Sequence, residues 1–120
     1  MKITAFFTYR DVIEDILNGK YDFFAEEYKT NLIGSNILLV DNKTNEILAL
    51  ANLKDAFRIT IDEFIERNHL DSNNEEIYER FIDAKLYGWR VKIEKIFDKP
   101  KVLEPYEKTY ERFIDIDFDI

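Results

Sequence analysis

The sequence lacks cysteine altogether, and histidine, proline and glycine are scarce. Without cysteine the chain can form no disulfide, no thiolate metal site and no cysteine nucleophile. The single histidine, His69, leaves multi-histidine metal sites and a Ser-His-Asp triad without the residues that they need. The sequence also has no glycine-rich phosphate loop and no dinucleotide-binding fingerprint. We therefore expect neither a metal site nor a cofactor.

Long apolar runs are missing too. No run approaches the length of roughly 18 residues that a membrane-spanning helix needs, and the N-terminal MKITAFFTYRD has no secretory signal pattern. We therefore expect a cytoplasmic protein with no membrane partner. The balance of 17 basic and 25 acidic side chains gives a net charge of −8, which argues against a general binder of polyanions.

The residues that are present suffice for one compact domain. The chain has 120 residues, of which 46% are apolar and 15% aromatic, a single-domain length with enough apolar side chains to bury a core. No linker rich in Gly, Ser or Pro, no internal repeat and no low-complexity segment interrupts it. We therefore expect a single domain over residues 1–120.

The first third of the chain predicts a strand followed by a helix. Residues 2–8 are rich in β-formers and predict a strand. Thr8 is expected to cap a helix that ends at Asn18-Gly19, because glycine tolerates the left-handed conformation found after helix ends. Residues 20–30 fit either an irregular strand or a loop.

The middle of the chain predicts a hairpin and two short helices. Residues 36–40 and 46–53 flank the turn-forming cluster DNKTN, and their continuous apolar character predicts strands covered on both faces. Thr60 begins a capping box of the T-x-x-E type, which predicts a helix ending near His69. A second helix is expected over residues 74–83.

Two alternating segments complete the pattern. Residues 86–97 place Tyr87, Trp89 and Val91 on one face of a predicted strand. Residues 113–120 alternate Ile and Phe with Asp, which predicts a half-buried terminal strand. Strands with helices inserted at two places predict an α+β fold built around a small mixed β-barrel, in which the first helix caps the barrel and a two-helix excursion precedes the closing strand.

Four short motifs in this order resemble the ASCH family of the PUA-like fold. The helix-end turn is ILNGK at residues 16–20, and the glycine-led strand is IGSNILL at residues 33–39. The closing strand contains LYGWRV at residues 86–91 and ends in DKP at residues 98–100. The resemblance covers residues 2–103, which leaves residues 104–120 as a C-terminal extension with its own strand.

The resemblance implies a barrel whose cleft, beside the first helix, accepts RNA or a nucleobase. Some small members resemble amidohydrolases that act on acylated cytidine with a lysine, a threonine and a glutamate. At the matching positions this sequence has Tyr21 in place of the lysine and Asp22 in place of the threonine. The catalytic pattern is therefore not matched, and a binding function is favoured over a diverged hydrolase.

Seven residues are the candidates for binding RNA or a modified nucleobase: Lys20, Tyr21, Asp22, Glu26, Trp89, Arg90 and Lys92. The first three lie at the family's cleft, and a glutamate such as Glu26 can accept a hydrogen bond from the amino group of cytosine. Residues 85–101 hold six Lys or Arg and two acids, a stripe that could contact phosphates. For three of them we expect a structural role instead: a solvated Lys20, a solvated Glu26 and a Trp89 that packs in the core.

A second hypothesis is an acidic inhibitor or adaptor, of phage type, that binds a basic protein such as a nucleic-acid-handling enzyme. Residues 62–83 contain eight acids and two arginines, although such a run is also typical of the solvated face of a helix pair. The candidate residues for this interaction are Asp62, Glu66, Glu75, Glu79, Asp115, Asp117 and Asp119. A basic cleft would favour the first hypothesis, and a contiguous acidic face the second.

Overall fold

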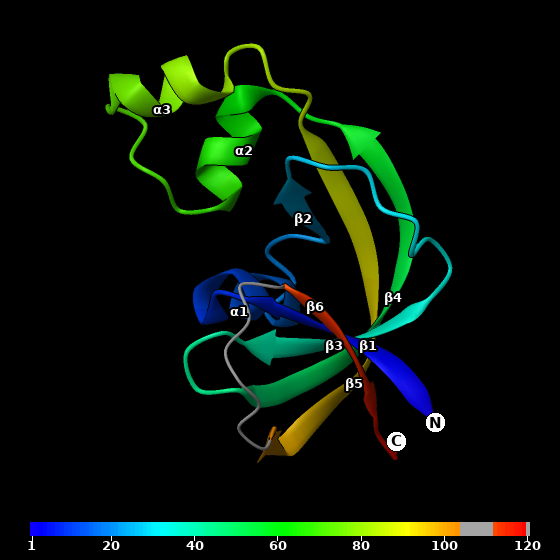
Figure 1. The fold of residues 1–120 in the computed structure, drawn as a ribbon. Coiled ribbons are helices and arrows are strands. Elements are labelled where there is room, and N and C mark those ends of the chain that lie inside the picture. Colours follow the sequence, from blue (N-terminus) through cyan, green and yellow to red (C-terminus); the bar gives the residue numbers. More distant parts are fainter. Residues whose placement is uncertain (104–111, 120) are drawn as a thin grey trace.

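The computed structural model describes residues 1–103 and 112–119. It consists of one mixed sheet and three helices, of which the second and third lie together at one end of the sheet (Figure 1). The strands are β1 (Lys2–Thr8), β2 (Phe23–Glu26), β3 (Asn36–Asp41), β4 (Glu46–Arg58), β5 (Tyr87–Val102) and β6 (Phe113–Asp117). The helices are α1 (Arg10–Leu17), α2 (Ile61–Arg67) and α3 (Glu75–Phe81). The α+β fold expected from the sequence is confirmed.

The sheet curls into a partly open barrel. Its strand order is β2-β5-β4-β3-β1-β6, with β1 parallel to β3 and the other neighbours antiparallel. Curvature brings the two edge strands to the same aromatic ring, because Phe6 of β1 lies 5.1 Å from Phe24 of β2 and 4.8 Å from Phe113 of β6, measured between ring centroids. We call the gap between the edge strands β2 and β6 the seam.

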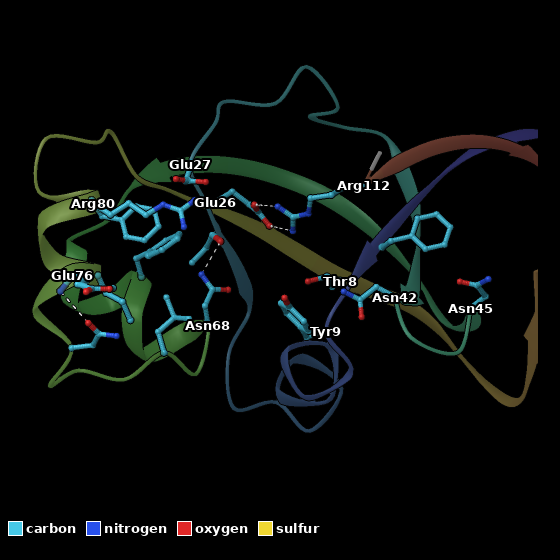
Figure 2. Close-up of a pocket in the computed structure, with 17 residues that line it drawn as sticks. Thr8, Tyr9, Glu26, Glu27, Asn42, Asn45, Asn68, Glu76, Arg80 and Arg112 are labelled. Atoms are coloured by element: carbon cyan, nitrogen blue, oxygen red, sulfur yellow. Dashed lines mark hydrogen bonds and ion pairs between the residues drawn. The ribbon is translucent and has the colours of Figure 1, made fainter. Parts of the chain in front are cut away.

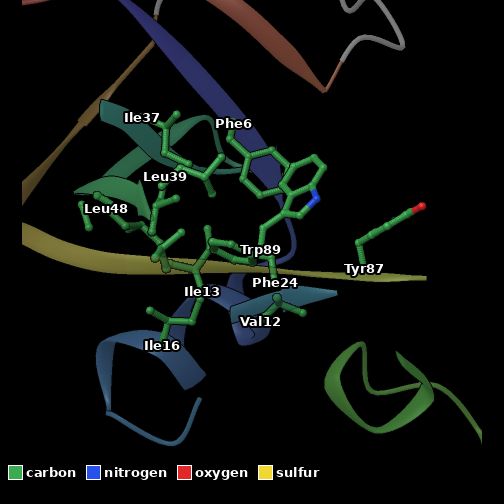
Figure 3. Packing of buried hydrophobic residues seen from close by; sticks show 14 residues of the cluster. Phe6, Val12, Ile13, Ile16, Phe24, Ile37, Leu39, Leu48, Tyr87 and Trp89 are labelled. Atoms are coloured by element: carbon green, nitrogen blue, oxygen red, sulfur yellow. The ribbon is translucent and has the colours of Figure 1, made fainter. Parts of the chain in front are cut away.

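The largest core cluster fills the inside of this curl (Figure 3). Trp89 is 4% exposed and packs against Phe6, with the ring centroids 6.0 Å apart. Val12, Ile13 and Ile16 of α1 cover the same cluster, which explains why the apolar face of that helix is turned inward. The expectation that Trp89 packs in the core is confirmed.

The start of α1 differs from the expected one. The N-cap residue is Tyr9, which makes no side-chain capping bond, and Thr8 instead remains in β1. The reason is that the parallel ladder continues to the pair Thr8–Asp41, so sheet pairing extends one residue beyond the position where a helix could begin. The expected end of the helix is confirmed, since Gly19 has a φ of 76°.

The remaining elements follow the sequence closely. The hairpin β3–β4 forms across its turn, and Thr60 and Glu63 make the complete capping box of α2. The ambiguous segment 20–30 contains the short strand β2, and β5 continues to Val102, beyond the expected residue 97. The terminal strand β6 pairs with β1, whereas Ile120 lies outside the described residues.

A side chain at Gly88 on β5 is expected to destabilise the fold. Its cross-strand partner is Phe57 on β4, and a Cβ at Gly88 would lie 2.5 Å from Cζ of that ring. Gly88→Ala is therefore expected to lower the free energy of unfolding by about 1–3 kcal/mol, measured by urea denaturation. In a Phe57→Ala background the same substitution should cost much less; an undiminished cost would show that the ring is not the cause.

Candidate functional site

An ion pair bridges the seam between the two edge strands. Glu26, the last residue of β2, accepts two parallel hydrogen bonds from the Arg112 guanidinium, at 2.6 and 2.7 Å. The Glu26 side chain is 7% exposed, whereas that of Arg112 is 47% exposed. Burial raises the pKa of the Glu26 carboxyl above its ordinary value of 4.5, and the Arg112 guanidinium offsets part of that rise. A buried carboxylate is thus held by a cation that solvent can still reach.

The backbone fixes this arginine in place. The Arg112 carbonyl accepts a hydrogen bond of 2.8 Å from the N–H of Phe7, and the guanidinium lies 5.1 Å above the ring of Phe6. Both contacts are to β1, the strand that lies next to β6 in the sheet. Arg112 therefore reaches from β1 and β6 across the seam to β2.

A pocket of about 930 Å³ opens on one side of this ion pair (Figure 2). We call it the seam pocket. Its apolar surface comes from residues of β1, β2, α2, α3 and the segment between the two helices: Phe7, Ala25, Phe64, Leu70, Ile77 and Phe81. Its polar groups, besides the ion pair, are Thr8, Tyr9, Glu27, Asn42, Asn45, Asn68, Asn74, Glu76 and Arg80.

The polar groups of the seam pocket suit an uncharged ligand. Three carboxylates and two guanidiniums line it, so it is not a basic cleft. The four asparagines each offer a donor and an acceptor on one short side chain. Asn68 already donates to the Ala25 carbonyl at 3.2 Å, which fixes the orientation of its amide. Such a mixture can recognise a planar polar molecule by hydrogen bonds on its edge and apolar contact on its face.

A second pocket of about 710 Å³ lies on the other side of the ion pair and shares Glu26 and Arg112 with the first. We call it the side pocket. Tyr28, Lys29 and Thr30, from the segment after β2, line it together with Trp89 and residues of β6. The Trp89 indole N–H donates to the Tyr28 carbonyl at 3.0 Å, so the buried tryptophan anchors this rim.

Two of the seven expected binding residues lie at these pockets. Glu26 lines both pockets and Trp89 lines the side pocket, whereas the other five line neither. The expectation of a solvated Glu26 is wrong, because the curl of the sheet buries it and Arg112 supplies a partner. An exposed Trp89 that stacks on a base is likewise not observed.

The expected cleft residues at the end of α1 take part in packing. The Tyr21 hydroxyl donates to Glu66 of α2 at 2.9 Å, and its ring lies 4.6 Å from the guanidinium of Arg67. Lys20 is exposed, and Asp22 lies 3.4 Å from Arg90 in an ion pair. This turn therefore docks α2 against α1 and lines neither pocket.

Arg67 is the centre of that packing. Its side chain is fully buried, and it donates to the Phe23 and Val12 carbonyls at 2.6 and 2.8 Å and to the Asp15 carboxylate at 3.2 Å. Burial lowers the pKa of the Arg67 guanidinium, although the nearby Asp15 and Tyr21 act in the opposite direction. The residue joins α1, β2 and α2, and so it fixes the helical wall of the seam pocket.

The basic stripe on β5 is partly neutralised. Arg90 donates to both carboxylate oxygens of Asp55 at 2.9 Å and also pairs with Asp22. Lys92 is exposed on the same strand. Of these two expected phosphate contacts, only Lys92 presents its charge to solvent without an ion pair that the described residues supply.

The acidic candidates lie on two separate parts of the molecule (Figure 1). Asp62 and Glu66 are on α2, and Glu75 and Glu79 are on α3, at the helical end. The strand acids are Asp115, Asp117 and Asp119, on and after the edge strand β6. Several also bond within the domain: Asp62 accepts from Tyr78, Glu66 from Tyr21, and Asp115 from Thr4.

The important residues that sequence reasoning missed are Arg112, Tyr9 and Tyr28. Arg112 lies in the segment that we expected to be an extension of the core, so nothing in the linear pattern pairs it with Glu26. The pocket asparagines occur in or beside turns, where asparagine is common for conformational reasons alone. Tyr28 offered a weak signal, since a tyrosine next to a lysine combines a ring that can stack on a base with a positive charge.

Within residues 1–103 and 112–119, no group of three or more His, Asp or Glu side chains is arranged to hold a metal ion. In the same part of the chain no helix has the length and apolar character needed to cross a membrane.

Comparison with solved structures identifies the fold. The crystal structure of the ASCH protein from Zymomonas mobilis superimposes with a TM-score of 0.59 at 11% sequence identity, over 83% of this chain and 73% of that one. The chain has the ASCH fold. A tyrosine-to-phenylalanine mutant of that protein matches with a TM-score of 0.59, over 86% of this chain and 77% of the mutant. No protein-family model and no curated protein matches by sequence, so the likeness to ASCH proteins is one of fold.

Proposed function

We propose that this ASCH-fold domain is a non-catalytic module that binds a nucleobase, free or within RNA, in the seam pocket. The observation that carries the proposal is the Glu26–Arg112 pair, which presents a buried carboxylate and a half-exposed guanidinium to an open pocket of about 930 Å³. That volume lies within the range of roughly 300–1,000 Å³ that small-molecule sites occupy. The ASCH fold is consistent with this choice.

The groups around the ion pair match the edge and the face of a base. Each Glu26 oxygen accepts one hydrogen bond from Arg112 and keeps a further lone pair that could accept the amino group of cytosine. The ring of Tyr9, which is 57% exposed, and the apolar side chains of the pocket offer surfaces for the face of the base. We therefore propose cytosine, or a modified cytosine that keeps an N–H at that position, as the ligand.

Two features support binding without catalysis. Tyr21 occupies the position where the hydrolase-like members of the ASCH family use a lysine, and its hydroxyl is already bonded to Glu66. Lys20, the nearest lysine in the sequence, is exposed and lines neither pocket.

A cytoplasmic location stays a prediction.

The second candidate, an acidic protein that binds a basic partner, rests on β6. This edge strand carries exposed Asp115 and Asp117, and its outer edge, which pairs with no strand among the described residues, could meet a basic partner. The helices that carry the other acidic candidates lie apart from β6 (Figure 1), so the seven candidate residues do not share one face. Nucleobase binding therefore remains the main proposal.

A comparison of cytidine with uridine tests the proposed hydrogen bond to Glu26, because uridine presents an acceptor where cytidine presents the amino group. Titration calorimetry is expected to show tighter binding of cytidine, and Glu26→Gln to weaken cytidine binding by about tenfold or more, since a charge-assisted hydrogen bond is lost. The same variant should also reduce the preference for cytidine over uridine, because glutamine can donate a hydrogen bond to the uridine oxygen.

Lys20→Ala is the matched control for this titration. It lies at the cleft that the sequence predicted but outside both pockets, so cytidine affinity should not change. A loss of affinity in Lys20→Ala with none in Glu26→Gln would contradict the proposal and move the site to the end of α1.

A further inference from the structure

We propose that the domain binds two consecutive nucleotides of a single strand, with one base in the seam pocket, the next in the side pocket, and the phosphate between them on Arg112. The inference rests on the proposed function and specifies its ligand as a dinucleotide step. Three observations carry it: the shared wall of the two pockets, the exposed aromatic side chain in each, and the donors of Arg112 that Glu26 does not use.

The two pockets adjoin at one pair of side chains. Glu26 and Arg112 are the residues that line both, so the ion pair is the partition between two cavities of about 930 and 710 Å³. A ligand that enters both must therefore cross Arg112. Neighbouring bases on a single strand are joined by a phosphate, the group that would lie at this partition.

Each pocket has one strongly exposed aromatic side chain. Tyr9 is 57% exposed and lines the seam pocket, and Tyr28 is 70% exposed and lines the side pocket. Within the described residues they are the only aromatic side chains in the exposed class. Exposed aromatic rings serve as stacking platforms for bases in single-strand binding. Two such platforms on opposite sides of one cation fit two successive bases.

Arg112 has the capacity to bind the linking phosphate. Glu26 accepts two of its N–H groups, which leaves further donors on a side chain that is 47% exposed. A guanidinium binds phosphate oxygens through parallel hydrogen bonds. Lys29, on the exposed rim of the side pocket, adds a second positive charge close to the same path. Besides Glu26, the carboxylate that lines the side pocket is Asp115. It accepts a hydrogen bond from the Thr4 hydroxyl, which directs it toward β1.

Calorimetric titrations with cytidine, CpA and ApC test the inference, the last two because the strand direction is not assumed. At least one dinucleotide is expected to bind about tenfold to hundredfold tighter than cytidine. Tyr28→Ala should reduce that ratio to the smaller part that the phosphate on Arg112 contributes, and Tyr28→Phe, which keeps the ring, should preserve the ratio. A methylphosphonate-linked version of the better dinucleotide, which has no backbone charge, should lose part of the gain and its salt dependence.

The outcomes separate the inference from the proposed function. If cytidine binds but neither dinucleotide binds tighter, the dinucleotide site is wrong while the nucleobase site stands. If the ratio is the same in Tyr28→Ala as in the native chain, the second base does not use the side pocket and the inference is overturned. If neither cytidine nor a dinucleotide binds, both proposals fail.

Discussion

Replacing Arg67 by alanine is expected to lower the free energy of unfolding by about 3–5 kcal/mol. The substitution removes a fully buried guanidinium and leaves the Phe23 and Val12 carbonyls without their hydrogen-bond donor. It also leaves a cavity where α1, β2 and α2 meet. Since a domain of this size is stable by roughly 5–15 kcal/mol, this single change removes a large part of the total. Urea denaturation followed by circular dichroism measures the loss.

Arg58→Ala is the matched control for this experiment. Arg58 is exposed on β4, and its guanidinium lies 5.6 Å from the ring of Tyr87, a contact worth roughly 0.5–1 kcal/mol at such a site. The same change of residue type should therefore cost less than about 1 kcal/mol. Equal losses in the two variants would contradict the structural role that we assign to Arg67.

The second large effect is expected at the seam. Arg112→Met removes the partner of Glu26 and leaves a buried carboxylate unpaired, which should cost about 2–3 kcal/mol at neutral pH. This is below the usual cost of breaking a fully buried pair, because Arg112 is half exposed and water partly screens it. The double variant Glu26→Gln with Arg112→Met has no buried charge and should recover part of the loss.

The loss in Arg112→Met is expected to depend on pH in a defined direction. Burial already raises the pKa of Glu26 above 4.5 in the fold, and removing the guanidinium raises it further. Because the folded-state pKa lies above the unfolded one, protonation stabilises the fold, and stability is lost as pH rises through the folded value. The destabilisation should therefore be largest at neutral pH and shrink as the pH falls towards 4.5.

Denaturation of Arg112→Met and of the double variant over this pH range measures the effect. The difference between the two variants should shrink on acidification, because glutamine does not titrate. A difference that stays constant with pH would show that the Glu26 carboxyl carries no buried charge.

The fold was predictable because local patterns and tertiary pairing agree along most of the chain. The capping box at Thr60 begins a helix, Gly19 ends one, and the alternation around Trp89 correctly gave its buried face. The ends of some elements are the exceptions. Thr8 stays in the ladder with β3 and does not cap α1, and β4 and β5 extend beyond residues 53 and 97.

The candidate site was much less predictable because it is formed by the closure of the sheet. Glu26 and Arg112 are 86 residues apart, and only the curl that brings β2 towards β6 makes them partners. Tyr21 and Arg90 have the composition expected of a binding site, but they are bonded to Glu66 and Asp55 within the domain. Residue types alone cannot separate a satisfied polar group from one that is available to a ligand.

The most direct measurement is a titration of the isotopically labelled protein with cytidine, followed by two-dimensional proton–nitrogen NMR. We predict saturable shifts at the side-chain amides of Asn42 and Asn68 and at the backbone N–H of Tyr9, with none at Lys20 or Asp22. These residues separate the two locations because the first three line the seam pocket and the last two line neither pocket. Shifts confined to the end of α1, or no saturable shift with cytidine, would contradict nucleobase binding at the seam.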